Sequence, residues 1–513
     1  MQDITVDSPK GRWVLGATIL ASSMAFIDST ALNVILPSLQ NSLNARGTDL
    51  FWILNAYLLM LASFILVGGS LGDKLGRKRI YMLGIMLFIL ASSACGLSPT
   101  VNWLIFFRAL QGLGGALMIP GSLSIISATF RKKEKGKAIG TWSAITTVVT
   151  VGGPILGGAL GDAGLWRLIF FINIPIGIIS LLALYFKVPE SRSDDISHRL
   201  DYQGAFLIVS SLSLLTFGFL RVPEVGWQHW QSWVSLCGGT LAFITFIFVE
   251  QKKDNPMVEL KLFHNTTFSA ANVLTFLLYA GLSAGMLFLT LNLIQIQRYS
   301  QLQAGLTLLP FSVLMFSIAR WAGSLVDRFG PRWLLIGGPA VAGLGFWLLS
   351  EVGETKGPEE FWTSFFPGIF FFGLGMSFTV APLTTTVMAS VDDRFSGTAS
   401  GVNNSMTRVS GVFANAVIGA LAILLFRTDL EEKISFLNIQ QGVRNKILIQ
   451  ASELGNAKVP ESVDNSLKEE VTNLLKSSFV HAFSTIQKIC AVLAWLASLV
   501  AFFLIRNPRG DTS

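Results

Sequence analysis

Charged side chains are scarce in this sequence, and their scarcity limits what kind of protein it can be. Only 13% of the 513 residues are Asp, Glu, Lys or Arg, against about 25% in an ordinary soluble domain. Hydrophobic residues make up 51% of the chain, and the mean hydropathy is +0.58. This composition excludes an ordinary soluble enzyme and indicates a protein that crosses a membrane several times.

Cysteine and histidine are also rare. The 3 cysteines and 4 histidines lie far apart in the sequence, whereas a metal site needs clustered ligands and a disulfide framework needs regular cysteine spacing. We therefore expect no metal, no cofactor and no disulfide framework. The pattern GxxxxGK[ST] is absent from the sequence too, so ATP is not expected to drive the protein.

Long apolar runs dominate what is present. About 20 apolar residues are needed to cross the hydrocarbon core as a helix. The sequence predicts an all-α polytopic membrane protein with fourteen such helices, the first being too long for a cleaved signal peptide. The predicted spans are 12–38, 50–72, 80–98, 102–126, 138–160, 167–186, 202–220, 231–249, 268–293, 304–326, 333–350, 361–388, 397–426 and 481–505.

The basic residues fall mostly in alternate loops. Lysine and arginine in short loops mark the cytoplasmic side of a membrane protein, and this pattern places both termini in the cytoplasm. The net charge of +7 is therefore a signal of topology, and it gives no support for nucleic-acid binding.

An internal repeat divides the chain. "GSLGDKLGRKR" at 69–79 returns as "GSLVDRFGPRW" at 323–333, and "GLGGALMIP" at 112–120 returns as "GLGMSFTVAP" at 373–382. The same order at nearly the same distance predicts two six-helix bundles, a recurrent transporter design. We expect a first bundle at 1–190, two inserted spans at 191–262, and a second bundle at 263–513 that includes an extracytoplasmic insert at 427–480.

These motifs resemble those of a known family. The loop with Gly69, Asp73, Gly76 and Arg77 looks like the signature loop of the major facilitator superfamily, and "RALQGLGGALMIP" is similar to the second motif of that family. "GGPILGGAL" at 152–160 resembles the antiporter motif, although Val149 stands where that motif has a further glycine.

Fourteen spans, "FIDSTALNVILP" and "WRLIFFINIPIG" together resemble the drug:proton antiporter branch of that family. The resemblance implies a proton-coupled exporter of amphipathic or cationic small molecules in a bacterial cytoplasmic membrane. It implies small-molecule substrate, protons and membrane lipid as partners. We expect a monomer, and contact with proteins of the cell envelope stays open.

The loop after the second predicted span has a physical interpretation of its own. Gly69 and Gly76 allow close backbone approach and sharp turns. Asp73 is expected just beyond the end of the span, where it can pair with Arg77 or face the N-terminus of a neighbouring helix. The second copy, with Asp327 and Arg328, favours a pair of gating latches over a loop that only sets the topology.

Charges within a span are costly and therefore carry functional hypotheses. Asp28 lies in the middle of the first span, where burial favours the uncharged carboxyl and so permits proton exchange. Together with Arg108 in the fourth span, it is the candidate for proton and substrate coupling. The alternatives are an aspartate that only joins two helices and an arginine that reaches the membrane interface.

Polar residues in the thirteenth span lie on one helical face. We expect Asn404, Arg408 and Asn415, together with Asn33 in the first span, to line a cavity; helix–helix adhesion is the alternative for the stripe. In the antiporter motif, Gly153, Pro154, Gly157 and Gly158 make the fifth span bendable and closely packed. By resemblance, this motif favours export and restricts leak.

Three questions stay open at this level. The insert 427–480 can be a helical cap or a solvated connection. The substrate can be a drug or an endogenous metabolite or lipid-like solute. A membrane enzyme or a sensor is disfavoured, because the sequence has no cluster of His, Glu or Cys at membrane depth and no large appended domain.

Overall fold

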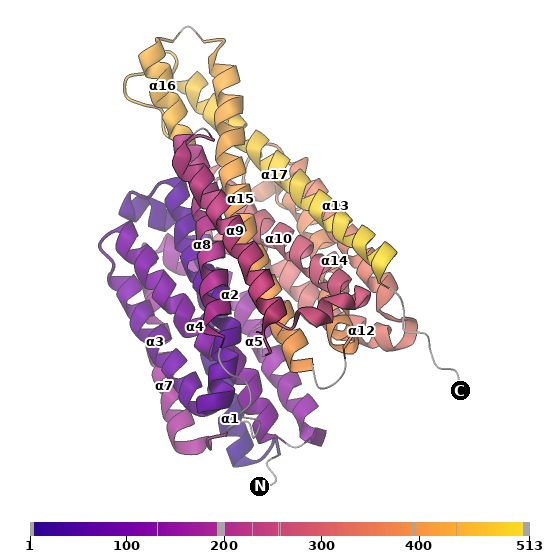
Figure 1. The fold of residues 1–513 in the computed structure, drawn as a ribbon. Coiled ribbons are helices and arrows are strands. Elements are labelled where there is room, and N and C mark those ends of the chain that lie inside the picture. The colour runs from indigo at the N-terminus through magenta and orange to yellow at the C-terminus, as the bar shows by residue number, and fades with distance from the viewer. Residues whose placement is uncertain are drawn as a thin grey trace.

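The protein, described by a computed structural model, is a bundle of long helices that run between two ends (Figure 1). The structure describes residues 5–130, 132–191, 201–227, 229–254, 256, 258–391, 396–437 and 439–505. Within these ranges, 14 helical segments are long and apolar enough to cross a membrane, which confirms the predicted fold class. We refer to the end that carries α16 (Gln441–Ile449) as the α16 end, and to the opposite end, where α1 begins and α17 ends, as the terminal end.

The first group of helices packs around α1 and α4. Helix α1 lies against α5 and α7, while α2 and α3 both lie against α4. Gly114 of α4 allows close approach, since a methyl group there would lie 2.7 Å from the backbone nitrogen of Phe88. The bounds are α1 Pro9–Leu43, α2 Gly47–Leu75, α3 Arg77–Leu97, α4 Val101–Thr129, α5 Lys132–Asp162, α6 Leu168–Phe171 and α7 Asn173–Lys187.

Two helices follow the first group in the chain. Helix α8 (Tyr202–Val225) packs against α9 (Trp230–Lys252), against α2, and against α15 of the second group. A small apolar cluster joins α2, α8 and α15 through Leu59, Leu212 and Val412. The inserted pair is therefore attached to the remainder of the molecule mainly through α8.

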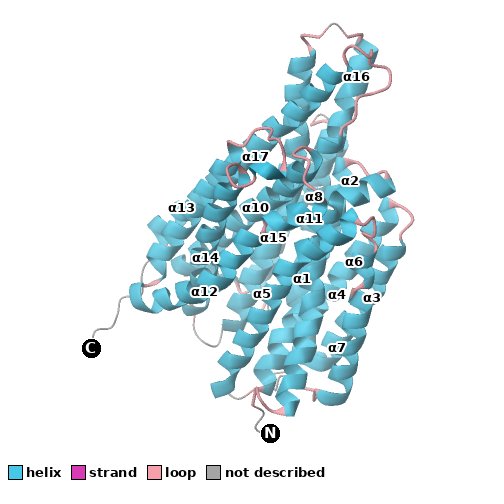
Figure 2. Cartoon of the chain, turned by 180° about the vertical axis from the view of Figure 1, so that it is seen from behind, coloured by secondary structure: helices cyan, strands magenta, loops and turns pink. Residues whose placement is uncertain are grey.

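The second group is built in a similar way, with α13 against α14 and α17, and α10 against α15 and α17. Figure 2 shows this group beside the first one from behind. Its elements are η1 Leu260–His264, α10 Thr266–Gln295, α11 Gln301–Thr307, α12 Leu309–Phe329, α13 Pro331–Ser350, η2 Pro358–Glu360, α14 Phe365–Ala389, α15 Ser396–Ile434, α16, η4 Gln450–Asn456 and α17 Lys468–Leu504.

The helices α15 and α17 extend further toward the α16 end than the hydropathy pattern predicts. Both continue into the insert 427–480, and α16 and η4 lie between them. Ile447, Leu454 and Val471 of the insert are buried in the main hydrophobic core. The insert is therefore helical and packed against the bundle, and its place over an outer mouth stays a prediction.

Candidate functional site

A buried cluster joins α1 to α4. The carboxylate of Asp28 lies 2.5 Å from a terminal guanidinium nitrogen of Arg108, and both side chains are at most 1% exposed. Gln111 connects the two, since its amide nitrogen donates to Asp28 at 2.8 Å and its oxygen accepts from Arg108 at 2.7 Å. Each charge thus has an opposite charge and a neutral amide as partners.

The remaining face of the Arg108 guanidinium meets α2. The side-chain Nε donates to the backbone oxygen of Ile53 at 3.3 Å, and the guanidinium carbon lies 4.4 Å from the centre of the Tyr57 ring. A cation over an aromatic face is stabilised more strongly when water is absent. The cluster therefore fastens α1, α2 and α4 around a single fully buried ion pair.

Such an ion pair can respond to a proton. Protonation of Asp28 removes the charge that balances Arg108, and an unpaired charge in a dry interior is strongly unfavourable. The helices around Arg108 are then favoured in any arrangement that gives the guanidinium water or another anion. The pair is therefore a candidate for coupling proton binding to a helix rearrangement.

Sequence reasoning identified Asp28 and Arg108 but did not identify them as partners. It also missed Gln111 and Tyr57. The spacing of Gln111, three residues after Arg108 on a helix, places both on one face and is the signal that could have found it. Tyr57 carries no comparable signal in the sequence.

The predicted polar stripe on α15 divides into residues with different surroundings. Asn415 is buried and accepts a hydrogen bond at 3.1 Å from Ser283 of α10. Asn404 is exposed and lies 3.5 Å from the Ser400 hydroxyl, and Arg408 is half-buried. The stripe therefore runs from a helix contact to an accessible surface.

Another side chain of α15 joins α10. The amide of Asn403 donates to the hydroxyl of Thr275 at 2.7 Å and to the oxygen of Asn272 at 3.3 Å, and the sequence interpretation did not single it out. Asn33, the remaining cavity candidate, is half-buried on α1. Asn404 bonds within its own helix, to Ser400, and among the described contacts no hydrogen bond joins it to Asn33.

The turn between α2 and α3 is held by an unforeseen partner. Gly76 adopts a φ of +115° and precedes α3. The Glu190 carboxylate, which follows α7, accepts from the backbone nitrogens of Lys78 at 3.0 Å and Arg79 at 3.2 Å. A carboxylate is favourable at a helix N-terminus, where backbone N–H groups are unsatisfied.

The same turn also caps α7. The Lys78 ammonium donates to the backbone oxygens of Tyr185 at 3.0 Å and Val188 at 2.8 Å. Arg77 donates from its backbone nitrogen to the Ser191 oxygen at 2.9 Å. The signature loop is thus tied to the end of α7 by charges at both helix termini.

Other residues of the predicted gating loops are placed differently or lie outside the described part. Asp73 belongs to the last turn of α2 and not to a loop beyond it. The side chains of Asp73, Asp327 and Arg328 lie outside the described residues. Of the two adjacent glycines, Gly68 packs closely against α4, because a methyl group there would overlap the backbone oxygen of Ala116. A methyl group at Gly69 would lie 3.7 Å from Pro120, which is an ordinary contact distance.

The glycines of the antiporter motif set the position of α5. A methyl group at Gly157 would lie 2.6 Å from the Ala31 oxygen, and one at Gly153 would overlap the Thr30 hydroxyl, so this face fits tightly against α1. Gly158 faces the second group, where a methyl group would lie 2.6 Å from the α-carbon of Leu302. The backbone oxygen of Pro154 lies against Gly305 of α11.

Hydrogen bonds between the two groups gather at the α16 end. The Asp162 carboxylate accepts from the backbone nitrogens of Gln301 at 2.7 Å and Leu302 at 2.9 Å, and so caps α11. The Gln301 amide also donates to the Ser38 hydroxyl.

The insert adds further bonds to this seam. The Gln40 amide donates to the Glu453 backbone oxygen at 3.0 Å and accepts from Gln295 at 2.9 Å, and Asn456 donates to Asn41 at 3.0 Å. We call all of these contacts the seal, made by Ser38, Gln40, Asn41, Gly158, Asp162, Gln295, Gln301, Leu302, Glu453 and Asn456.

The sequence pattern of the Major Facilitator Superfamily matches residues 18–415. The chain belongs to this superfamily. The resemblance drawn from its motifs is thereby confirmed, and a superfamily member with this fold is a transporter and not an enzyme.

The chain is similar to two proteins that are named for resistance. It is 29% identical to the tetracenomycin C resistance and export protein of Streptomyces glaucescens, over 96% of this chain and 92% of that protein. It is 33% identical to the multidrug resistance protein Stp of Mycobacterium tuberculosis (strain CDC 1551 / Oshkosh), over 81% of this chain and 76% of that protein.

A solved structure shares the superfamily fold. It is the inward-facing, unoccupied crystal structure of a bacterial homolog to the human lysosomal transporter Spinster, with a TM-score of 0.63 and 19% identity over 97% of this chain and 98% of that one.

Proposed function

We propose that this protein is a proton-coupled exporter of amphipathic drug-like molecules that works by alternating access. The similarity over almost the whole chain to a resistance and export protein carries the substrate class. The buried ion pair between Asp28 and Arg108 carries the proposed coupling to protons. Relatives with resistance names support drug efflux.

The two groups of helices are proposed to be the two halves that rock against each other. Transporters of this kind bind substrate near the bilayer midplane at the interface of their repeats. Helices α1–α7 form the first half, α10–α17 the second, and α8 and α9 the inserted pair. The seal joins the halves at the α16 end, and we propose that the structure is the state closed there and open toward the terminal end.

The terminal end is proposed to face the cytoplasm of a bacterial cell. Basic residues are abundant there, and lysine and arginine in short loops favour the cytoplasmic side. On this orientation the seal closes the outer mouth and the structure is inward-facing. The helix ends there carry Lys10 and Arg12 where α1 begins, Lys74 where α2 ends, Arg77, Lys78 and Arg79 where α3 begins, Lys135 and Lys137 near the start of α5, and Lys187 where α7 ends.

The proton is proposed to act through Asp28. In the outward-facing state, a proton from outside neutralises Asp28 and frees Arg108, which favours substrate release and return to the inward-facing state. In the cytoplasm, loss of the proton restores the ion pair seen here. Such coupling requires that proton and substrate each bind the two states with different affinity.

The substrate is proposed to contact the accessible part of α15. Asn404 is exposed and Arg408 is half-buried on this helix, and Asn33 of α1 is a candidate on the opposite side. Arg408 belongs to α15, which packs against α2 of the first group and α10 of the second, so it lies on a helix at the interface of the halves.

Arg408 also favours a second candidate substrate. An arginine on the substrate path repels cations, and the charge of Asp28 is already balanced by Arg108. A neutral or anionic solute, such as an endogenous metabolite or a lipid-like molecule, is therefore the alternative to a cationic drug.

The test is proton-driven transport into energised everted vesicles, whose cytoplasmic face is on the outside. Wild-type protein is expected to export ethidium or a neutral antibiotic, with collapse on addition of a protonophore, and Asp28→Asn is expected to abolish proton-driven export. Asp464→Asn, at an exposed position, is the matched control. Full export by Asp28→Asn would refute the coupling, whereas export of neither compound by the wild type would refute the drug substrate.

A further inference from the structure

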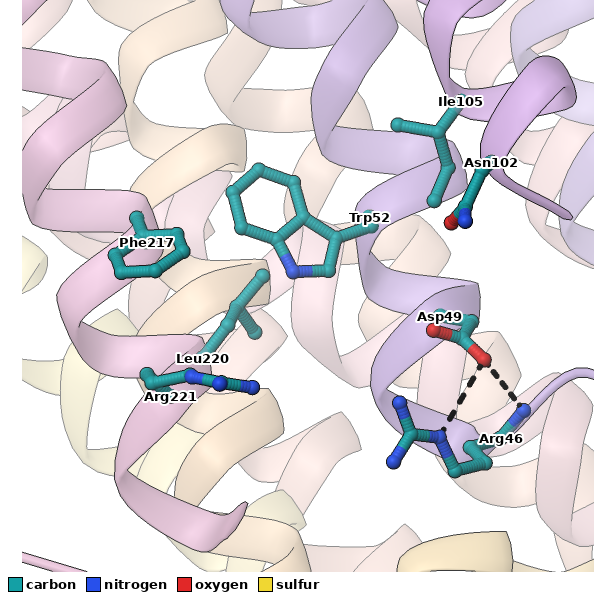
Figure 3. A pocket seen from close by; sticks show the side chains of 8 residues that line it. All are labelled: Arg46, Asp49, Trp52, Asn102, Ile105, Phe217, Leu220 and Arg221. Carbon is teal, nitrogen blue, oxygen red and sulfur yellow. Dashed lines mark hydrogen bonds and ion pairs between the residues drawn. The ribbon is translucent and has the colours of Figure 1, made fainter. Parts of the chain in front are cut away.

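A pocket of about 260 Å³ lies between α2, α4 and α8, on the side of the first group that faces the inserted pair. Its lining shares no residue with the ion pair of Asp28 or with the seal, although the charges of Arg46 and Asp49 act on Glu453 of the seal. Figure 3 shows two guanidinium groups, of Arg46 and Arg221, on opposite walls, with the indole ring of Trp52 between them. The complete lining is Arg46, Asp49, Trp52, Asn102, Ile105, Phe217, Leu220 and Arg221.

The charge of the lining favours an anion. Two guanidinium groups and one carboxylate face the pocket, so its lining carries a net positive charge. Asp49 accepts from the backbone nitrogen of Arg46 at 2.8 Å and lies 3.8 Å from the Arg46 Nε. That ion pair is long, and the Arg46 side chain is 56% exposed, so water screens the pair.

The polarity of the pocket changes along the membrane normal. On α2, Trp52 lies about one helical turn deeper than Asp49, and on α4, Ile105 lies about one turn deeper than Asn102. On α8, Phe217 lies about one turn deeper than Arg221. Polar groups therefore face the α16 end and apolar groups face the middle of the membrane on all three walls.

Exposed tryptophans place this boundary at the level of lipid headgroups. Trp103 is 52% exposed next to Asn102, and Trp227 is 48% and Trp230 65% exposed just after the end of α8. Tryptophan is enriched at the interface between hydrocarbon and headgroups. The two guanidinium groups thus lie where phosphates of the bilayer lie.

An occupant must match both the polar part and the apolar part of the pocket. A phosphate accepts from the several N–H donors of an arginine in a fixed planar geometry. The rings of Trp52 and Phe217, whose centres lie 6.3 Å apart, present apolar surface for the first part of a hydrocarbon chain. A volume of about 260 Å³ is close to the lower limit of small-molecule pockets, so it fits a headgroup and not a whole lipid.

We propose that this pocket binds the phosphate headgroup of an anionic phospholipid from the leaflet at the α16 end. The lipid would hold α8 against α2 and α4, and so join the inserted pair to the first half. This inference is independent of the proposed export activity, because lipid binding is measured without transport.

Native mass spectrometry of the detergent-purified full chain tests the proposal. Phosphatidylglycerol and phosphatidylcholine of identical acyl chains are the probes. We expect wild-type protein to bind phosphatidylglycerol about tenfold more tightly than phosphatidylcholine, the size of one charge-assisted contact. Arg46→Gln combined with Arg221→Gln should remove this preference, and Arg221→Lys should retain part of it.

Arg427→Gln is the matched control, since it removes an exposed arginine of α15 near the same end. It should bind phosphatidylglycerol like the wild type. Equal binding by the double variant, or equal loss in Arg427→Gln, would overturn the proposal. A thermal melt of each variant separates loss of the site from loss of the fold.

Two further arms identify the source of the anion. Inorganic phosphate that displaces the lipid at low millimolar concentration would indicate a site for free anions and overturn the lipid assignment. Equal binding of phosphatidylcholine would indicate an apolar groove with no role for the arginines, and would overturn it too. Selective retention of phosphatidylglycerol in the presence of phosphate supports it.

Discussion

Two polar regions hold this molecule together, and they are built in opposite ways. The Asp28 cluster lies inside one half, is dry, and contains a full ion pair. The seal lies between the halves, near one end, and consists of amide and carboxylate groups bonded to neutral partners. On the proposed mechanism the seal opens in every transport cycle and must be weak. The Asp28 cluster would detect a proton and must be charged and buried, because only there does one proton change the energy greatly.

The largest effect is expected when the ion pair is broken from one side. Arg108→Ala leaves Asp28 buried without its cation, and loss of one partner of a buried pair costs about 3–5 kcal/mol. A melt of the purified protein should show this as a strongly lowered transition temperature.

The double variant Asp28→Asn with Arg108→Gln sharpens this result. Because it leaves no unpaired charge, it should be more stable than Arg108→Ala alone. If Arg108→Ala were as stable as the wild type, the Asp28 cluster would not be the stronger of the two polar regions.

A smaller effect is expected at Gly158 in the seal. Gly158→Ala places a methyl group against the backbone of α11, and overpacking of this kind costs about 1–3 kcal/mol. It should therefore favour opening of the α16 end. Spin labels at Ala163 and Lys356, in a variant whose exposed Cys237 is replaced by Ser, should report longer distances.

Gly152→Ala is the control for that experiment. The same distance measurement should be unchanged, since a methyl group at Gly152 meets nothing within 4 Å. Identical distance distributions for both variants would show that the glycine contact does not hold the seal closed.

A single amide bond in the seal should contribute still less. Asn456→Ala removes the hydrogen bond to Asn41, and a neutral bond of this kind contributes about 0.5–1.5 kcal/mol. The same spin labels should show a modest gain of the open population. If Asn456→Ala changed the free energy of closure by as much as Arg108→Ala changes the free energy of unfolding, the seal would not consist of weak contacts.

The smallest effect is a pH dependence of the seal. Burial raises the pKa of Glu453 above its ordinary value of 4.5, and Asp49 adds to this, against the hydrogen bond from Gln40 and the charges of Arg46 and Lys458. The closed seal therefore favours the protonated carboxyl. Closure should be strongest in acid and weaken as the pH rises past the ordinary value and through the raised one.

Glu453→Gln cannot titrate and should flatten that dependence. The closed population, measured with the same labels across the acidic range, is the readout. A dependence that persists in Glu453→Gln would assign it to another group.

Much of the fold could be predicted from the sequence, because twenty apolar residues in a row leave few alternatives to a membrane helix. The early start of α17 at Lys468 could not, since the mixed-charge sequence there is stabilised by tertiary contacts with the rest of the insert and not by the bilayer. Likewise, Asp28 and Arg108 stand out as charges within apolar runs. Their pairing could not be predicted, because a single sequence does not show which helices pack against each other. Glu190 had no signal, because it is a single acid in a polar connection.

The inserted pair gives this transporter two unlike sides. Helix α8 contacts both α2 and α15, which belong to different halves, so it lies across the line along which the halves meet. A hydrophobic molecule that diffuses within the bilayer encounters α8 and α9 on that side. On the other side it encounters α5 and α12 directly. We therefore expect lateral exchange between lipid and protein at the face of α5 and α12, which would give the molecule a front and a back within the plane of the membrane.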